Sequence, residues 1–229
     1  MNNSLRNFNY IIYSEVNKFA IYIDPFDLSL TLPDKIGKDI VPKYLLNTHE
    51  HPDHIKDNLN FLKIKNTEKL ILSDGEEFFL SMSEKIICRH TPGHVDKHFC
   101  YFIYENNKLN SIISGDTVFH AGVGNCKNGG NVEELYYSIK NIFYPLNDDV
   151  IIYPSHDYLL NNLAFAKSLG GDKKQIESYV QKYEEFRQNN MYYNTKIKDE
   201  KIINPFFQVM LRDDSKDQFI KLRALRDRW

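Results

Sequence analysis

The 229-residue sequence has few cysteines, almost no net charge and no long apolar run, and each scarcity excludes a class of protein. Its three cysteines, Cys88, Cys100 and Cys126, form no CxxC pair and cannot close a disulfide set, which suits a reducing compartment. The formal net charge of −2 provides no strong field toward nucleic acid or a membrane surface. Because no apolar stretch approaches the roughly twenty residues that span a bilayer, we expect a cytoplasmic protein outside the membrane.

Residues 1–16, "MNNSLRNFNYIIYSEV", alternate apolar and polar side chains and lack the continuous hydrophobic segment of a secretory signal. We therefore expect no signal peptide. The hydrophobic residues, 42% of the chain, are spread along its whole length and suffice for one large domain, or for one domain plus a smaller appendage. The sequence contains no internal repeat and no low-complexity segment.

The type of pattern changes near residue 158, which predicts two units: a strand-rich catalytic body at 1–158 and a small helical unit at 159–229. Asn106 and Asn107 predict a tight hairpin turn, because Asn tolerates positive φ. Strand-like runs occur at 10–16, 19–27, 43–49, 69–74, 85–94, 99–105, 110–116 and 149–158. Helical spacing occurs at 55–64, 131–143, 161–169, 172–190 and 215–229, and residues 188–204 read as a long exposed connection.

The segment "NTHEHPDHIKDN", residues 47–58, concentrates side chains that bind metals. His51 precedes a proline, which favours extended backbone, so the segment is not expected to be helical. In an extended segment alternate side chains share a face, which brings His49, His51 and Asp53 together, and a turn at His54 aims a further imidazole at a neighbouring point. A lone histidine is more often a hydrogen-bonded structural residue, but four such side chains after an apolar run favour a metal site.

Three later residues complete the candidate ligand set, each at the end of a predicted strand: His94, Asp116 and His156. Ligands gathered from several strand ends are typical of a catalytic site on a rigid sheet. Each alone has an alternative, since Asp116 can cap a turn and His156 can be a satisfied interior histidine. A structural role is predicted for the other histidines, His90, His98 and His120, because none matches this strand-end pattern.

These motifs resemble the metallo-β-lactamase superfamily: T-H-x-H-x-D-H at 48–54, "TPGH" at 91–94, "GDT" at 115–117 and a late strand-end histidine. More closely, "SGDTVFHAG", "YPSHDYLLNNLAFAKS" and "NPFF" resemble glyoxalase II, the hydroxyacylglutathione hydrolases, over nearly the whole chain. The resemblance implies an α/β fold, a four-layer αββα sandwich with a small C-terminal helical domain that holds the substrate. It also implies a small-molecule glutathione thioester as substrate, and we expect a monomer.

The resemblance further implies two divalent metal ions per chain. One ion would be held by His49, His51 and His94, the second by Asp53, His54 and His156, with Asp116 bridging both and with Asp53 and Asp116 in catalytic roles. Zn²⁺ is the expected ion, and iron or manganese also suit mixed imidazole and carboxylate coordination. Asp24, at a predicted strand end, is a candidate partner for a ligand histidine, with the start of a turn as its alternative role.

Chemistry supports the pairing of two ions. Ions about 3.5–4 Å apart can share a water and lower its pKa from about 15.7 toward about 7, which provides hydroxide at neutral pH. Attack of that hydroxide on a thioester carbonyl releases a thiolate. A thiol of pKa about 8.5 departs with little help from a general acid.

Cations are expected to bind the substrate carboxylates. The family signature R-x-x-K-D-x-F falls on Arg223, Arg226, Asp227 and Trp229, with Arg226 in place of Lys and Trp229 in place of Phe. Without the resemblance, this basic run would read as a solvated helix face. Tyr158 matches a family tyrosine near the glutathione thiol. The loop "GVGNCKNGG" at 122–130 departs from the family's "GCGR/K-F-x-E-G", and Lys127 is predicted to replace the lost contact.

The leading hypothesis is therefore a metal-dependent hydrolase that cleaves S-2-hydroxyacylglutathione, such as S-D-lactoylglutathione, to glutathione and a 2-hydroxy acid. A second hypothesis is a mononuclear iron glutathione-persulfide dioxygenase of the same superfamily, since a site with two histidines and a carboxylate suits iron and O₂. The complete set of second-site residues argues against it. A third, a non-catalytic metal-storing protein, is disfavoured because structural sites are closed by Cys and His.

Overall fold

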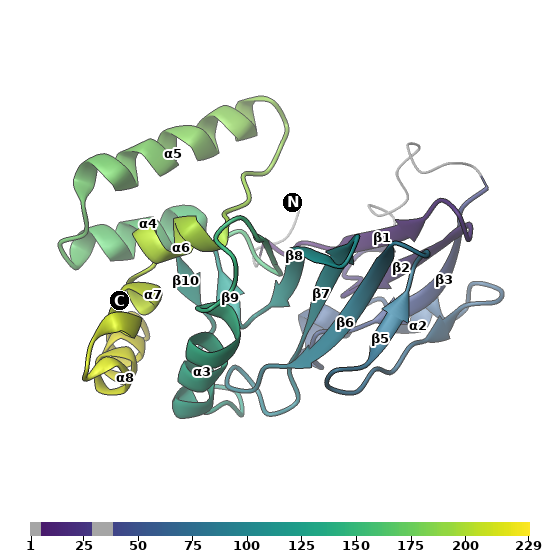
Figure 1. The fold of residues 1–229 in the computed structure, drawn as a ribbon, viewed down its shortest axis with the longest axis horizontal. Helices are drawn as coiled ribbons and strands as arrows, with labels where there is room; N and C mark the ends of the chain where they lie inside the picture. The colour runs from purple at the N-terminus through teal and green to yellow at the C-terminus, as the bar shows by residue number, and fades with distance from the viewer. Residues whose placement is uncertain (1–5, 29–38) are drawn as a thin grey trace.

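The chain folds into two facing β-sheets with helices on their outer surfaces, and further helices lie at one end of this sandwich (Figure 1). The computed structural model describes residues 6–28 and 39–229, so residues 1–5 of the segment expected to carry no signal peptide lie outside the described part. Among the described residues, no helix is both long and apolar enough to cross a membrane. The predicted αββα sandwich with a C-terminal helical region is confirmed.

The first sheet has the strand order β1-β2-β3-β4. β1 and β2 are antiparallel and form the hairpin predicted around Asn17, with the neighbouring Lys18 at a φ of 56°. β3 and β4 pair in parallel, and the strand predicted over 69–74 is wrong beyond its first residue because β3 ends at Leu46 and offers no further partner. The strands are β1 Tyr10–Ser14, β2 Phe19–Ile23, β3 Val41–Leu46 and β4 Glu68–Lys69.

The second sheet has the order β11-β8-β7-β6-β5, antiparallel except for the parallel pair of β11 and β8. The predicted turn between β7 and β8 is confirmed, since Asn106 and Asn107 have φ values of 50° and 61°. The strands are β5 Glu77–Phe79, β6 Glu84–His90, β7 Phe99–Glu105, β8 Lys108–Gly115 and β11 Ile151–Pro154. A separate pair, β9 Val118–Phe119 and β10 Gly122–Val123, was not predicted from the sequence.

The inner core fills the space between the two sheets. Ile21 and Ile23 of β2 are buried against Ile86 of β6 and Ile113 of β8. Strand residues that alternate in sequence point to the same side, so Ile21 and Ile23 both face this layer. Each fully buried aliphatic side chain contributes about 1.5–3 kcal/mol, so this layer holds the sheets at a fixed separation and keeps their ends in register.

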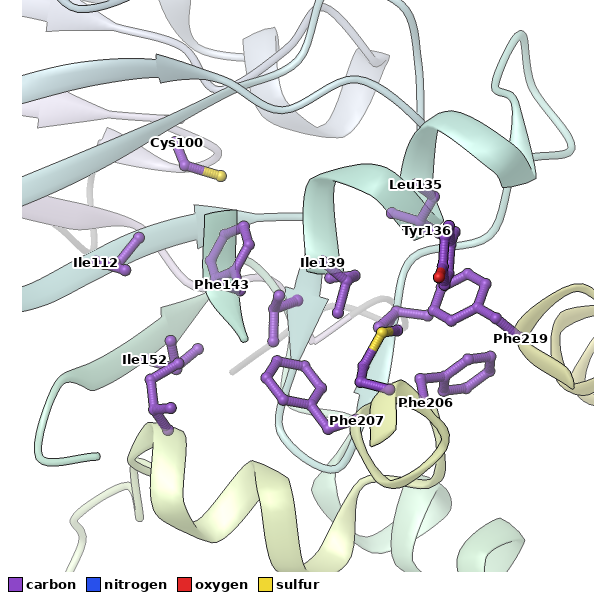
Figure 2. Packing of buried hydrophobic residues seen from close by; sticks show 14 of the residues in the cluster. Cys100, Ile112, Leu135, Tyr136, Ile139, Phe143, Ile152, Phe206, Phe207 and Phe219 are labelled. Carbon is purple, nitrogen blue, oxygen red and sulfur yellow. The ribbon is translucent and has the colours of Figure 1, made fainter. Parts of the chain in front are cut away.

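A second core lies between the outer face of the β11-β8-β7 side and the helices. α3 Val132–Ser138 continues into the π-helical segment η2 Ile139–Phe143, as the predicted apolar stripe requires. In Figure 2, Phe207 of the C-terminal region points toward Ile139 and Phe143, whereas Phe206 and Phe219 lie together near Tyr136. Because residues from both sides of the predicted boundary at 158 share this core, the helical region is packed directly onto the strand-rich body.

The C-terminal region is helical, as predicted, but residues 188–204 are not an exposed connection. Ile197 and Glu200 of this segment are fully buried, because Thr195, which is fully buried as well, leads into a helix that packs onto the β9–β10 turn. The helices are α4 Leu159–Ser168, α5 Lys173–Gln188, α6 Ile197–Ile203, α7 Pro205–Gln208 and α8 Ser215–Arg226, with the short 3₁₀ segment η3 Val209–Leu211.

Candidate metal centre

The histidine-rich segment follows β3 and ends in a helix. His51 is extended, with a ψ of 148°, as expected before a proline. The prediction of a non-helical segment is wrong from Pro52 onward, since α1 spans Pro52–Ile55. Proline fits the first helical position because its fixed φ is already helical and its missing N–H is not needed there. As a result Asp53 does not share a face with His49 and His51. It turns with His54 toward a second group of side chains.

Three imidazoles converge on one point. His49 Nε2 and His94 Nε2 each lie 3.0 Å from His51 Nδ1. Tetrahedral zinc with nitrogen ligands at about 2.0–2.1 Å places those nitrogens roughly 3.3 Å apart, close to the spacing found here. One residue comes from the β3 loop, one from the residue before α1 and one from the loop after β6, so the strand ends of two sheets meet at this point.

A second group lies beside the first. Asp53 Oδ2 is 3.5 Å from both His54 Nε2 and His156 Nε2. Asp116 lies between the groups: its Oδ1 is 3.6 Å from His54 Nε2 and 3.5 Å from His156 Nε2, and its Oδ2 is 3.5 Å from His94 Nε2. The structure thus brings together all seven side chains that the sequence singled out. Their assignment as ligands stays a prediction.

The buried polar atoms of this cluster fit a bound cation. His54 Nε2 and Asp116 Oδ1 are buried and, among the described residues, have no hydrogen-bond partner. Buried polar atoms are nearly always paired, because leaving one unpaired costs about 1–3 kcal/mol. A cation coordinated by both atoms removes that cost. The donor set of imidazole nitrogens and carboxylate oxygens suits divalent zinc, iron or manganese.

The titration behaviour follows from burial and close charges. Burial lowers the pKa of His94 and lowers that of His49 far below its usual range, so both rings are neutral and have a lone pair to offer. Burial also opposes the charged form of His54, but Asp24 and Asp116 outweigh it and raise its pKa to about 9. For Asp116, burial is outweighed by His156 and His54, and its pKa falls well below the ordinary value. The buried Asp116 carboxylate is therefore ionised and can interact with a cation.

Three of the imidazoles, those of His54, His49 and His94, have a partner on their other nitrogen. The Asp24 carboxylate lies 2.9 Å from His54 Nδ1, so the partner role anticipated for Asp24 is the one that its geometry supports. The same carboxylate accepts hydrogen bonds from the backbone N–H and the hydroxyl of Thr48, and that hydroxyl is 3.0 Å from His49 Nδ1. His94 Nδ1 lies 2.7 Å from the carbonyl oxygen of Asn125. Such partners fix the ring orientation at metal sites.

His98 has the structural role that the sequence analysis predicted for it, and the structure shows which turn it supports. Its Nε2 accepts a hydrogen bond of 3.0 Å from the backbone N–H of Asp116. Its Nδ1 is 3.0 Å from the hydroxyls of Thr91 and Thr117. Gly115 packs against the ring at a φ of +54°, where a Cβ would lie 2.6 Å from His98 Nε2. His98 thus supports the Asp116 turn, and its ring stacks on that of the candidate ligand His49 at 5.0 Å. No local spacing signals these contacts.

Arg223 occupies a different environment from the one expected of a substrate-binding cation. Its guanidinium is buried and donates to the carbonyl oxygens of Val123 and Gly124 at 3.0 and 3.1 Å. It also donates to Asp227 at 2.8 Å. The backbone that it holds continues directly into Asn125, whose carbonyl oxygen contacts His94. Arg223 therefore supports the loop beside the metal cluster.

The other predicted substrate-binding residues lie nearer to solvent. Tyr158 stacks on the ring of His156 at 5.0 Å and 7°, and burial raises its pKa to about 12. Arg226 is partly buried and donates to Asn162 Oδ1 at 3.3 Å. Lys127 is exposed, and its Nζ donates to the carbonyl oxygen of Asp227 at 3.1 Å. Of these three residues, Tyr158 directly contacts a candidate ligand, whereas Arg226 and Lys127 contact Asn162 and Asp227.

Comparison with known proteins identifies relatives of one kind. A family model described as "Hydroxyacylglutathione hydrolase C-terminus" matches residues 157–229. A hydroxyacylglutathione hydrolase of Polaromonas sp. is 30% identical over 99% of this chain and 97% of its own length. Among solved structures, ETHE1 from Myxococcus xanthus matches with a TM-score of 0.68 and 21% identity over 96% of this chain and 86% of its own. A metallo-β-lactamase from Staphylococcus aureus matches with a TM-score of 0.61 and 17% identity over 96% and 67% of the two chains. The two structures share the fold.

Proposed function

Because this chain belongs to the hydroxyacylglutathione hydrolase family, we propose that it hydrolyses S-2-hydroxyacylglutathione thioesters, such as S-D-lactoylglutathione, to glutathione and a 2-hydroxy acid. The observation that carries the proposal is the convergence of seven imidazole and carboxylate side chains from separate strand ends, with Asp116 facing both halves of the group. A site for a single ion would not need the second group of side chains, Asp53, His54 and His156.

We propose two divalent ions at this cluster, with Zn²⁺ as the expected species. One would be held by His49, His51 and His94, and the other by Asp53, His54 and His156, with Asp116 shared. Ions bound there would polarise the thioester carbonyl and lower the pKa of a coordinated water from about 15.7 toward about 7. The chain itself keeps the rings of His49 and His94 neutral by burial, and it fixes the direction of His54 through Asp24 and that of His94 through the Asn125 carbonyl.

The residues around the cluster have separate tasks in this reaction. Asn7 donates a hydrogen bond of 2.9 Å to Asp53 Oδ2, the same oxygen that lies 3.5 Å from His54 Nε2 and His156 Nε2, and so holds this carboxylate toward the cluster. Tyr158 keeps its proton at neutral pH, because its pKa is raised to about 12, so its hydroxyl can donate to the sulfur side of the substrate. A thiol of pKa about 8.5 leaves readily as thiolate, so no further acid is required of the chain.

The proposed division of labour follows the chain. Residues 1–158 contain every candidate metal ligand, and residues 159–229 contain Arg226, the more exposed arginine of the family signature. We assign the first part to catalysis and the second to substrate binding, with Lys127 reaching across to the C-terminal helix. The proposal includes a cytoplasmic location, because Cys88 and Cys100 are buried free thiols.

The test is release of free thiol from S-D-lactoylglutathione by metal-loaded protein, followed with a thiol reagent. Asp116→Asn is expected to lower the rate at least about a hundredfold, since even partners behind metal ligands are worth 10–100-fold. Asp213→Asn, a change at an exposed carboxylate, is the matched control and should keep the full rate. Oxygen uptake with glutathione persulfide and one iron per chain, without thioester cleavage, would establish the dioxygenase alternative and overturn the proposal.

A further inference from the structure

The substrate of the proposed reaction carries carboxylates, and two of the three predicted cations are engaged with the protein itself. Arg223 is buried against the 123–124 backbone, and Lys127 contacts Asp227. Among the described residues, these two cations are therefore not free to bind a substrate carboxylate. A cation from another part of the chain, Arg6, lies beside the ring of Tyr158.

Arg6 lies directly beside the metal cluster. Its guanidinium carbon is 5.4 Å from the centre of the Tyr158 ring, and that ring stacks on His156 at 5.0 Å. The side chain is partly buried, and within residues 6–28 and 39–229 no carboxylate forms an ion pair with it. Arg6 is thus one aromatic ring away from a candidate metal ligand, with its charge available to a bound molecule.

The backbone holds Arg6 in this place. The N–H of Asp157 donates to the Arg6 carbonyl oxygen at 3.1 Å, and the N–H of Phe8 donates to Ser155 at 2.7 Å. These bonds tie the N-terminal segment to the end of β11, where the candidate ligand His156 also lies. Arg6 has a φ of 54°, a left-handed conformation that is unfavourable for arginine and that the flanking bonds maintain.

We propose that Arg6 binds a carboxylate of the glutathione thioester and makes the site selective for anionic thioesters, an inference that rests on the proposed function. Only the Tyr158 ring separates the Arg6 guanidinium from the His156 ring, so a substrate with its thioester at the cluster can pass Tyr158 and place a carboxylate against Arg6. The guanidinium grips a carboxylate with two parallel hydrogen bonds, and its position over Tyr158 fixes its plane in advance.

Arg226 provides the comparison. It also acts on Tyr158 electrostatically, but from α8, and it is held by Asn162 and by its position over Trp229 at 5.0 Å. Tyr158 therefore has one arginine from the N-terminal segment and one from the C-terminal helix. A substrate that lies across this tyrosine can present carboxylates to both parts of the chain.

The experiment compares Arg6→Ala and Arg6→Lys with wild type on S-D-lactoylglutathione and on its diethyl ester, in which both carboxylates are blocked. Arg6→Ala is expected to raise KM for the free acid about tenfold with little change in kcat, and Arg6→Lys to recover part of this. On the diethyl ester, wild type and Arg6→Ala should have equal KM. Arg212→Ala, an exposed arginine before α8, is the matched control and should behave as wild type.

Binding of S-methylglutathione, measured by calorimetry on metal-loaded protein, separates this inference from the proposed function. Wild type that binds this probe about tenfold more tightly than Arg6→Ala, yet cleaves no thioester, would refute the hydrolase proposal and support the role of Arg6. Equal binding and equal KM in wild type and Arg6→Ala would overturn the inference. Equal losses on the free acid and the diethyl ester would also overturn it, because they would show a structural effect of the substitution. Metal content and thermal unfolding identify any variant that is misfolded.

Discussion

Arg223 and Arg226 lie about one helical turn apart on α8, and both fall on the family signature. The structure predicts that their removal affects different properties of the protein. Arg223 is buried and donates to two backbone carbonyl oxygens and to Asp227. Arg226 is partly buried and makes one long hydrogen bond of 3.3 Å to Asn162. We therefore expect Arg223→Met to affect folding and Arg226→Met to affect substrate binding.

The expected loss of stability in Arg223→Met follows from the Asp227 carboxylate that the substitution leaves without its partner. Removing one partner of a buried ion pair costs about 3–5 kcal/mol, and the lower value applies because the Asp227 side chain is 25% exposed. A chain of this length loses about 2–4 °C of Tm per kcal/mol, so the expected drop is about 10 °C. Since the carbonyl of Asn125 follows the supported segment and contacts His94, metal affinity and kcat should fall as well.

Thermal unfolding, metal content and steady-state kinetics on both variants test this reasoning. Arg226→Met should keep its Tm within about 2 °C, because a partly exposed hydrogen bond contributes little, and should raise KM severalfold. Arg223→Lys, which retains the charge but not the fork of donors, should fall between Arg223→Met and wild type. An unchanged Tm in Arg223→Met together with a raised KM would refute the supporting role and restore Arg223 as a substrate-binding residue.

Three further predictions concern the metal cluster and the buried carboxylate of α6. His156→Ala should bind one metal ion per chain instead of two, as measured by elemental analysis, and retention of two ions would contradict the shared arrangement around Asp116. Gly124→Ala should lose at least about tenfold in metal affinity, because its Cβ would lie 2.0 Å from the Asp116 carbonyl oxygen; Gly129→Ala meets open space and should keep metal binding, despite a cost of about 1 kcal/mol for its φ of +91°. Burial raises the pKa of Glu200 to about 7 from 4.5, so the folded state holds a proton that the unfolded state releases, and stability should fall by about 3 kcal/mol as pH rises through this window. Urea unfolding at pH 5 and pH 8 should show this loss of stability in wild type but not in Glu200→Gln. The same change in unfolding free energy in both proteins would contradict the prediction.

The fold class and the members of the candidate site were predictable because their signals are local. Alternating apolar residues predicted the strands of both sheets, and Asn106 and Asn107 predicted a hairpin turn that their positive φ values confirm. The ligand candidates follow strand ends, and strand ends of a two-sheet sandwich gather at one edge. Residue type and position along the strands were therefore enough to select the side chains that meet at the cluster.

Where the sequence prediction was wrong, the deciding contact was not local. Pro52 was interpreted as a signal against helix, yet it occupies the first position of α1. Residues 188–204 are polar enough to read as exposed, but Glu200 is fully buried because Ala121, Thr195 and Asn204 donate to it.

What the sequence alone determined is the set of chemical groups available to this protein: which residues can bind metal, which segments alternate, and which helices are amphipathic. Only the tertiary structure decided how the charged groups are used. Arg223 meets carbonyl groups about one hundred positions earlier in the chain, and Arg6 meets a tyrosine from the start of α4. Periodicity records which face of an element is apolar, whereas the partner of a buried charge depends on how distant elements pack, and that information is not contained in any local spacing.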